Sequence, residues 1–160
     1  MASMQPTIGE VLSSLWKESK GSAEGRLAFS RALGEMVPYT GSIGAVVREL
    51  EPGVAVVELT EHAAILNHLS SIHAVALMNL AELTTGMALL PSLGGGVRGI
   101  LRGLSISYEK KARGTITATS SVSLPEIDGD TELQVEATIT DEQGDVCSYA
   151  TATWRLGLVE

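Results

Sequence analysis

The 160-residue sequence is poor in cysteine, aromatic residues and positive charge. Cys147 is its only cysteine, so it can form neither an internal disulfide nor a Cys/His zinc cluster, and a reducing, cytoplasmic location is expected. There are 11 Lys and Arg against 19 Asp and Glu, a net charge of −8. This balance disfavours a general nucleic-acid binder, because phosphate affinity needs clustered cations.

Targeting and membrane signals are also missing. No basic segment followed by an apolar stretch stands at the N-terminus, so no signal peptide is expected. The longest apolar stretch, Val75 to Leu90, is interrupted by Asn79, Glu82 and two threonines, and we expect it to be too short and too polar to cross a bilayer. With 44% hydrophobic and 19% charged residues, the chain is typical of a globular protein that binds neither membrane nor nucleic acid.

The first 37 residues predict a helical extension rather than a separate domain. Apolar residues recur at helical spacing in Thr7–Lys20, where Thr7 is a suitable N-cap with a glutamate three residues later. A second helix is predicted at Ala23–Met36, ending before a proline. The main domain is expected to occupy residues 38–160.

For the main domain, the sequence pattern predicts two strands, one long helix and four further strands. Gly44–Leu50 and Val54–Thr60 alternate in polarity, and Glu51-Pro52-Gly53 between them indicates a hairpin. A polar loop at 62–72 precedes an apolar helix at about Ala74–Leu90, which a proline and a glycine run end. The four later strands are predicted at 100–109, 115–123, 133–141 and 146–156, with a turn at 142–145.

This order predicts an α+β fold in which one antiparallel sheet curls around the long helix. A helix that is apolar on nearly all sides must be buried, and a curled sheet would bury it. The outer face of the sheet would then be solvated or paired with another subunit.

The segment from Asn67 to Leu77 places a polar loop directly before the buried helix. Helix N-termini carry free N–H groups and a partial positive charge, which can hold a developing oxyanion. We expect the N–H groups of Ala74 and Val75 to act as donors, Asn67 to add a side-chain donor, and His73 to lie at the helix mouth. The alternative is that Asn67 and His73 are caps or packed polar residues.

Glu82 lies inside the apolar helix. Burial would raise its pKa toward that of a general base, whereas a partly exposed position or a structural hydrogen bond is the alternative. His73 and Glu82 are nine residues apart, on opposite sides of an ideal helix and about 13.5 Å apart along its axis. One chain cannot bring both to the same carbonyl, but two antiparallel helices related by a two-fold axis can, so a catalytic site would be shared between subunits. No residues stand at metal-ligand spacing.

The spacing of Asn67, His73 and Glu82 resembles the signature of hotdog-fold thioesterases of the phenylacetate-pathway type. In that family an Asn, a His-Gly-Gly helix start and an acidic residue in the long helix form the site. The similarity covers about residues 35–158 and resembles a bacterial branch of the superfamily. It includes Pro38-Tyr39, Glu51-Pro52-Gly53, Ala81-Glu82-Leu83, Gly103 to Tyr108, Lys110 to Gly114 and Thr153-Trp154-Arg155.

The resemblance implies hydrolysis of an acyl-CoA or related acyl thioester by a homodimer or a dimer of dimers. Glu82 would activate a water or attack the carbonyl, the Ala74 N–H would bind the oxyanion, and Asn67 would orient the water or polarise the carbonyl. His73 would shape the loop. No cofactor is implied beyond the coenzyme A thioester as substrate.

The same resemblance implies that the phosphates of coenzyme A lie near cations, and Lys110, Lys111 and Arg113 form the best local patch. The alternative is that these residues are an ordinary solvated strand end.

The sequence departs from the family pattern at two places. His-Gly-Gly is replaced by His73-Ala74-Val75, and Val75 would narrow the approach of the thioester. Leu101 and Arg102 stand where many relatives place a serine or threonine, and Arg102 could pair with Glu82. A non-catalytic protein that binds an acyl group or acyl-CoA is therefore the main alternative, and a hotdog dehydratase ranks last.

Overall fold

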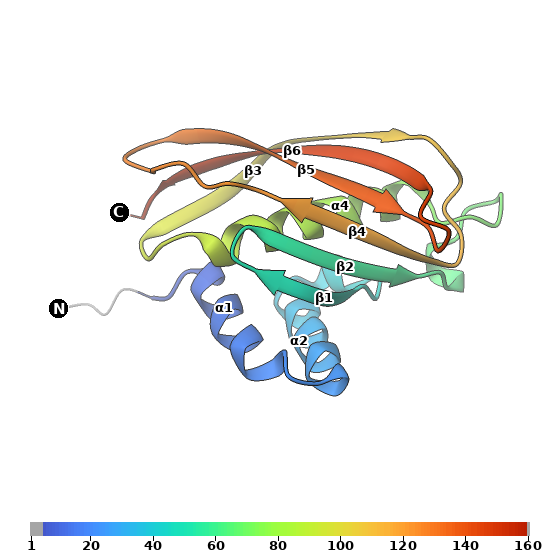
Figure 1. Ribbon diagram of the computed structural model, residues 1–160, viewed down its shortest axis with the longest axis horizontal. Helices are drawn as coiled ribbons and strands as arrows, with labels where there is room; N and C mark the ends of the chain where they lie inside the picture. Colours follow the sequence, from blue (N-terminus) through green and yellow to red (C-terminus); the bar gives the residue numbers. More distant parts are fainter. Residues whose placement is uncertain (1–4, 160) are drawn as a thin grey trace.

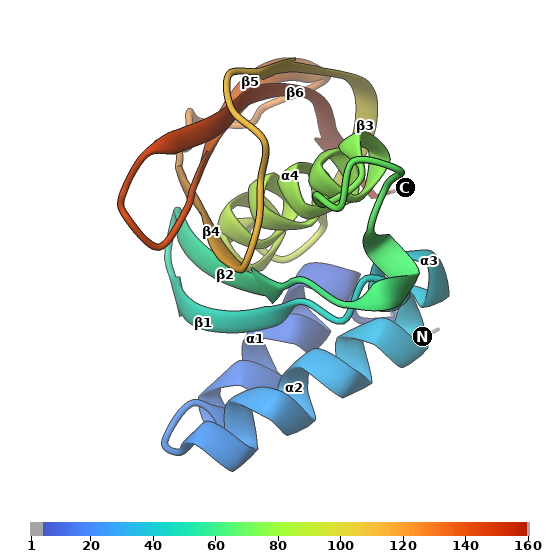
Figure 2. The same ribbon diagram turned by 90° about the vertical axis from the view of Figure 1, so that its right-hand side faces the viewer.

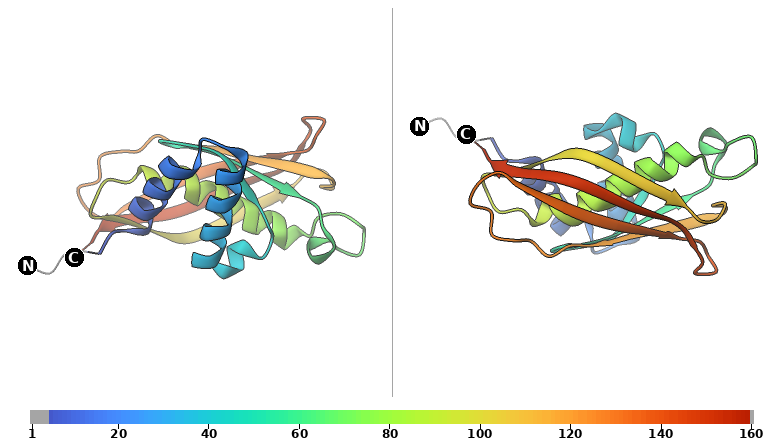
Figure 3. Two further views of the ribbon diagram at one scale, coloured as in Figure 1. Left: turned by 90° about the horizontal axis from the view of Figure 1, so that it is seen from below. Right: turned by 90° about the horizontal axis from the view of Figure 1, so that it is seen from above.

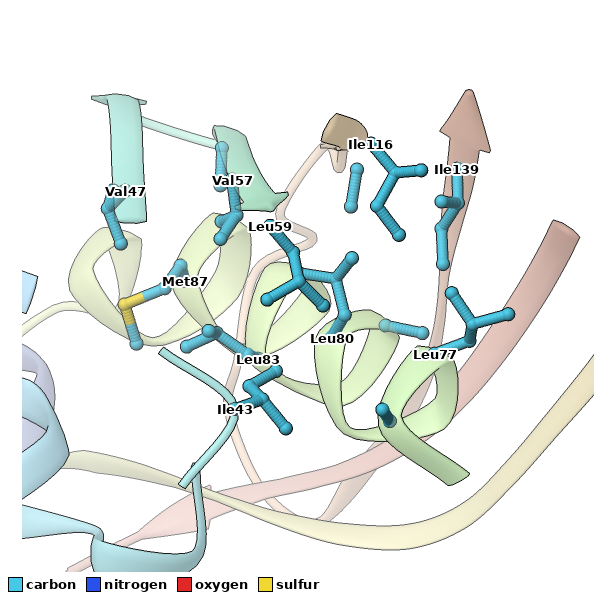
Figure 4. Close-up of a cluster of buried hydrophobic side chains, with 14 of the residues drawn as sticks. Ile43, Val47, Val57, Leu59, Leu77, Leu80, Leu83, Met87, Ile116 and Ile139 are labelled. Atoms are coloured by element: carbon cyan, nitrogen blue, oxygen red, sulfur yellow. The ribbon is translucent and has the colours of Figure 1, made fainter. Parts of the chain in front are cut away.

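Helix α4 (Ala74–Leu89) is the centre of the structure, a computed structural model that describes residues 5–159. Apolar side chains cover most of its circumference, so it is stable only when it is enclosed. Leu80, Ala81, Ala88 and Leu89 are fully buried. Figure 2 looks along α4 and shows the sheet curving around it. Figure 4 shows Leu77 and Leu80 packed under Ile116 and Ile139 of the sheet.

The six strands form one antiparallel sheet in the order β1-β2-β4-β5-β6-β3 (Figure 1). The predicted order of two strands, one helix and four strands is confirmed. Gly53, with φ of +76°, closes the predicted hairpin between the first two strands. The strands are β1 (Val46–Glu51), β2 (Val54–Thr60), β3 (Val97–Tyr108), β4 (Thr115–Ser121), β5 (Thr131–Thr140) and β6 (Val146–Leu158).

Strand β3 is an edge strand with a β-bulge at Arg102. Leu101 pairs with Trp154 and Gly103 pairs with Thr153, so Arg102 is the extra residue. One extra residue reverses which side chains face the core. Leu101 before the bulge and Leu104 after it therefore both pack against the hydrophobic core. Figure 3 shows β3 along one margin of the sheet.

Helices α1 (Ile8–Ser19) and α2 (Ala23–Met36) form the predicted extension. Thr7 and Glu10 make the predicted capping box. Trp16 and Phe29 pack edge to face with ring centroids 5.0 Å apart, and both belong to the cluster that includes residues of the sheet. The extension therefore shares the core of the main domain.

A short helix, α3 (Pro38–Gly41), follows α2 and was not predicted. Pro38 ends α2 as expected, but proline is also favoured in the first turn of a helix and begins a new one here. The side-chain nitrogen of Asn79 donates a hydrogen bond to the carbonyl of Tyr39 at 3.0 Å. This contact attaches α3 to the middle of α4.

The length of the central helix corrects one expectation. A 3₁₀ turn, η2 (Leu90–Ser92), extends α4, so Ala74–Ser92 is long and apolar enough to cross a membrane by length and composition alone. The expectation that it is too short and too polar was wrong. Within the structure, 67% of its most apolar window is buried, which is the behaviour of a core helix.

Candidate active site

One stripe of α4 is incompletely covered by the sheet. Val75, Met78 and Glu82 follow one another at spacings of three and four residues, so they share a face, and Val75 is 50% exposed. We call these three residues the open stripe. Two elements contact α4 through hydrogen bonds: α3, whose Tyr39 is exposed, and β3, which among the described strands pairs with β6 alone.

Glu82 is mostly buried, and burial raises the pKa of its carboxyl group above the ordinary value of 4.5. Among residues 5–159 the structure gives its carboxylate no hydrogen bond and no ion pair. Arg102 is exposed on the bulge of β3 and makes no salt bridge with Glu82 in the described chain. The ion pair between Glu82 and Arg102, which would quench the basicity of Glu82, is therefore not formed in the described chain. The Glu82 carboxylate is available to act as a base.

Glu82→Gln should stabilise the folded chain at neutral pH. A carboxyl group whose folded pKa is raised holds its proton more tightly when folded, so the free energy of unfolding falls as pH rises from the unfolded pKa through the folded pKa. Glutamine cannot ionise and escapes this loss. We expect a Tm a few degrees above that of the wild type at pH 7 and little difference near pH 4, measured by thermal unfolding. An equal or lower Tm at pH 7 would contradict the unpaired, buried state of Glu82.

The loop before α4 is held by its own side chains. Asn67 Oδ1 accepts hydrogen bonds from the Leu69 N–H at 2.9 Å, the Ser71 N–H at 3.2 Å and Ser71 Oγ at 3.1 Å. Ser70 has φ of 53°, an uncommon conformation for a residue other than glycine. Arg113 donates to the carbonyls of Leu69 and Ser70, both at 3.2 Å. Asn67 is therefore a loop cap whose oxygen is engaged, and its Nδ2 is the group that could face a substrate.

His73 caps α4. Its Nδ1 accepts a hydrogen bond from the Val75 N–H at 3.0 Å, so a neutral His73 carries its proton on Nε2. The Val75 N–H, expected from sequence to face an oxyanion, is thus already used. The structure records no acceptor for the Ala74 N–H within residues 5–159, which leaves Ala74 as the donor at the helix mouth.

Tyr108 also belongs to the helix mouth, and the sequence reasoning assigned it no role. Its hydroxyl donates to the Ala74 carbonyl at 2.8 Å, joining the end of β3 to the first turn of α4. The sequence signal was its place at the end of a strand in a segment shared with the resembling family. The contact holds the peptide between Ala74 and Val75 against the end of β3.

The structure brings some of the expected residues together and separates others. Asn67, Ala74, Tyr108, Lys110 and Lys111 line one cavity of about 290 Å³. A second cavity of about 350 Å³ is lined by His73 and Val75 together with α3 and Asn79. Glu82 lines neither cavity.

Within one chain, the helix mouth and Glu82 are separated mainly along the axis of α4. Val75 and Glu82 share the open stripe but are two turns apart, about 10.5 Å along the axis. On an ideal helix His73 lies on the side opposite Glu82, whereas Val75 lies on the same side as Glu82.

The expected phosphate patch has little free positive charge. Lys110 Nζ contacts Asp141 at 2.6 Å and Asp145 at 2.7 Å, and these hydrogen bonds raise the pKa of its ammonium group. Arg113 is engaged with the loop carbonyls. Lys111 is exposed and is the remaining cation of the three. Within the described residues, no group of three His, Cys, Asp or Glu side chains is placed to hold a metal ion.

Comparison with known proteins agrees with this architecture. The family model described as "Domain of unknown function (DUF4442)" matches residues 25–156. No curated protein matches the chain.

Solved structures resemble the whole fold. The genomics target APC5556 is 27% identical with a TM-score of 0.80, over 93% of this chain and 99% of that chain. A Pseudomonas aeruginosa protein described as a probable thioesterase is 27% identical with a TM-score of 0.73, over 82% and 95%. The Escherichia coli PaaI protein from the phenylacetic acid degradation operon is 20% identical with a TM-score of 0.68, over 93% and 99%. The chain belongs to the DUF4442 family, within the hotdog-fold thioesterase superfamily.

Proposed function

We propose that this chain is a cytoplasmic hydrolase of an acyl-CoA or related acyl thioester, with an active site shared between two copies of the chain. The observation that carries the proposal is Glu82, a mostly buried carboxylate on the open stripe of the central helix that has no hydrogen-bond or ion-pair partner among residues 5–159. The 27% identical Pseudomonas aeruginosa protein, described as a probable thioesterase, supports the reaction class.

The chemistry needs a base and an oxyanion donor. Glu82 would remove a proton from a water while the water oxygen attacks the thioester carbonyl carbon. The Ala74 N–H would stabilise the oxyanion at the positive end of α4, and Asn67 Nδ2 would orient the water or the carbonyl. As the C–S bond breaks, the departing thiolate takes the proton held by Glu82. Direct attack by Glu82 on the carbonyl is the alternative first step: the C–S bond breaks, the thiolate leaves, and water then opens the resulting anhydride.

In this scheme the Ala74 N–H and the Glu82 carboxylate of one site come from different chains. Ala74 and Glu82 are eight residues apart, about 12 Å along one helix, which is too far for one carbonyl. A second α4 running antiparallel beside the open stripe would place the mouth of one helix near the carboxylate of the other, twice per dimer. The unpaired edge of β3, where Ile100 is 52% exposed, would pair with its copy, and two such dimers would form a tetramer.

Coenzyme A would lie along the cavity at the helix mouth, which Asn67, Ala74 and Lys111 line. Because Lys110 and Arg113 are already engaged, Lys111 would supply the main attraction for a phosphate. No further cofactor takes part in this scheme.

Subunit mixing tests the shared site. Glu82→Gln removes the base, and Ala74→Pro removes only the N–H at the first helical position. If each site takes Glu82 from one chain and Ala74 from the other, a dimer of the two variants has one intact site and one doubly defective site. Co-refolding equal amounts should restore about a quarter of the wild-type sites, measured as kcat with acyl-CoA substrates. A mixture no more active than the separate variants would refute sharing.

Binding without hydrolysis is the second candidate. The observation that favours it is that the Val75 N–H already donates to His73 Nδ1 and is therefore not available to an oxyanion. A hydrolysis screen over acyl chain length and aromatic acyl groups, run beside calorimetric titration with the same thioesters, separates the two. Tight binding without turnover across the panel would replace hydrolysis with binding.

A further inference from the structure

A larger cavity lies on the other side of α3. It has a volume of about 650 Å³, is partly open to solvent, and is lined by residues of α2, α3, the start of β1 and Leu83 of α4. Cavities that hold small organic ligands are typically about 300–1,000 Å³. The N-terminal extension therefore does more than cover the core, because with α3 it lines a space of ligand size.

The walls of this cavity are mainly apolar. The apolar side chains are Leu27, Leu33, Pro38, Ala45, Val46 and Leu83. Two glycines shape it, since a Cβ on Gly34 would lie 2.9 Å from the Cα of Gly41.

The charged groups at the cavity favour a neutral ligand segment. Arg31 and Glu35 both line it and are exposed, and they stand one turn apart on α2. Opposite charges at this spacing offset one another. The cavity therefore suits an uncharged, apolar chain better than an anionic or cationic group.

The cavity reaches the turn of α4 that carries Glu82. Leu83 forms part of its wall and follows Glu82 directly in the chain, whereas Glu82 itself does not line the cavity. Figure 4 shows the side chains of Leu83 and Ile43 lying side by side between α4 and the segment before β1. Asn79, one turn earlier, holds α3 against the helix at this point.

We propose that this cavity is the acyl pocket and that the substrate carries a medium or long aliphatic acyl chain. The inference rests on the proposed hydrolase function and names its substrate class. An acyl chain lying against Leu27, Ala45 and Leu83 would bring its thioester end to the turn that carries Glu82. The N-terminal extension then sets chain-length preference.

Variants of the wall test the pocket. Ala45→Leu adds volume to a half-buried wall position, and Leu27→Ala removes an apolar side chain that is 39% exposed at the rim. The matched control is Leu124→Ala, since Leu124 is 37% exposed on the loop after β4 and does not line this cavity. kcat/KM is measured for acyl-CoA substrates from acetyl to palmitoyl.

The wild type should prefer the longer chains. Ala45→Leu should lower kcat/KM for them at least about tenfold, the discrimination a few methylene groups give in an apolar pocket, and leave short chains within about twofold. Leu27→Ala should lower it about threefold, and Leu124→Ala should leave the profile unchanged. Free long-chain fatty acid should inhibit the wild type competitively and Ala45→Leu more weakly.

The outcomes separate this inference from the proposed function. Turnover with a chain-length profile that neither wall variant changes would overturn the pocket and keep the hydrolase. A changed oligomeric state in Ala45→Leu with an unchanged profile would assign the cavity to a subunit interface, which also overturns it. No turnover in the wild type with any thioester would refute the proposed hydrolase function itself. If Ala45→Leu does not fold, Leu27→Ala, at an exposed position, still decides.

Discussion

Glu82→Gln should reduce kcat for acyl thioester hydrolysis by at least about two orders of magnitude, the contribution of a positioned general base. Glutamine has nearly the same shape and can neither accept the proton of a water nor form an anhydride with the acyl group. Because the carboxylate has no partner in the described chain, its replacement breaks no hydrogen bond. KM should change little, since Glu82 acts on the reacting atoms.

The pH profile provides an independent check on the same residue. Burial raises the pKa of Glu82, and only its ionised form is a base. The acid limb of kcat/KM should therefore rise with pH through a value above 4.5, the ordinary glutamate pKa. Glu18→Gln, on an exposed position of α1, is the matched control and should keep wild-type turnover and pH profile. Wild-type turnover by Glu82→Gln would exclude Glu82 from the reaction.

Ala74→Pro should reduce kcat by about 10²- to 10³-fold, the cost of losing one oxyanion donor. Proline lacks the N–H but is favoured at the first position of a helix, and Ala74 is that residue in α4. His73 has φ of −60° and ψ of 139°, which suits a residue before proline. The substitution therefore removes the N–H with little effect on the backbone.

Two variants control for the proline. Ala23 is the first residue of α2, and Ala23→Pro makes the same change away from the site. Ala74→Gly keeps the N–H and restores the glycine of the resembling family. Both should keep most of the wild-type kcat, measured alongside far-UV circular dichroism. Equal losses in Ala74→Pro and Ala74→Gly would show that the N–H is not the contributing group.

Much of the architecture could be predicted because it depends on local patterns. The period of apolar residues distinguishes α4 from the strands, and Thr7 with Glu10 defines the start of α1. Gly53 supplies the positive φ that the first hairpin needs. Helix capping, turn geometry and the alternation of polar and apolar residues are determined by residues that are close together in the sequence. The observed strand boundaries differ from the predicted ones by a few residues where strand pairing determines them. One example is Val97, the first residue of β3, which pairs with Leu158.

The sequence predicted which residues form the candidate site, but not which of their hydrogen-bond donors and charges are already engaged by other residues. His73 uses the Val75 N–H, and Lys110 is paired with Asp141 and Asp145 across the β5–β6 turn. Those contacts depend on side-chain rotamers and on groups that are distant in the sequence. Spacing identified which residues lie near the helix mouth but not which of their donors are already used.

The sequence by itself determined that a mostly apolar helix lies inside a curled antiparallel sheet, and that Glu82 interrupts that helix, since both follow from the order and period of residue types. Only the tertiary structure decided that Glu82 makes no ion pair with Arg102 within residues 5–159, that Tyr108 binds the Ala74 carbonyl, and that α2 and α3 line a cavity beside Leu83. The bulge at Arg102 and the packing of α3 on Asn79 join segments far apart in the chain. Such contacts depend on three-dimensional packing, which no local pattern records.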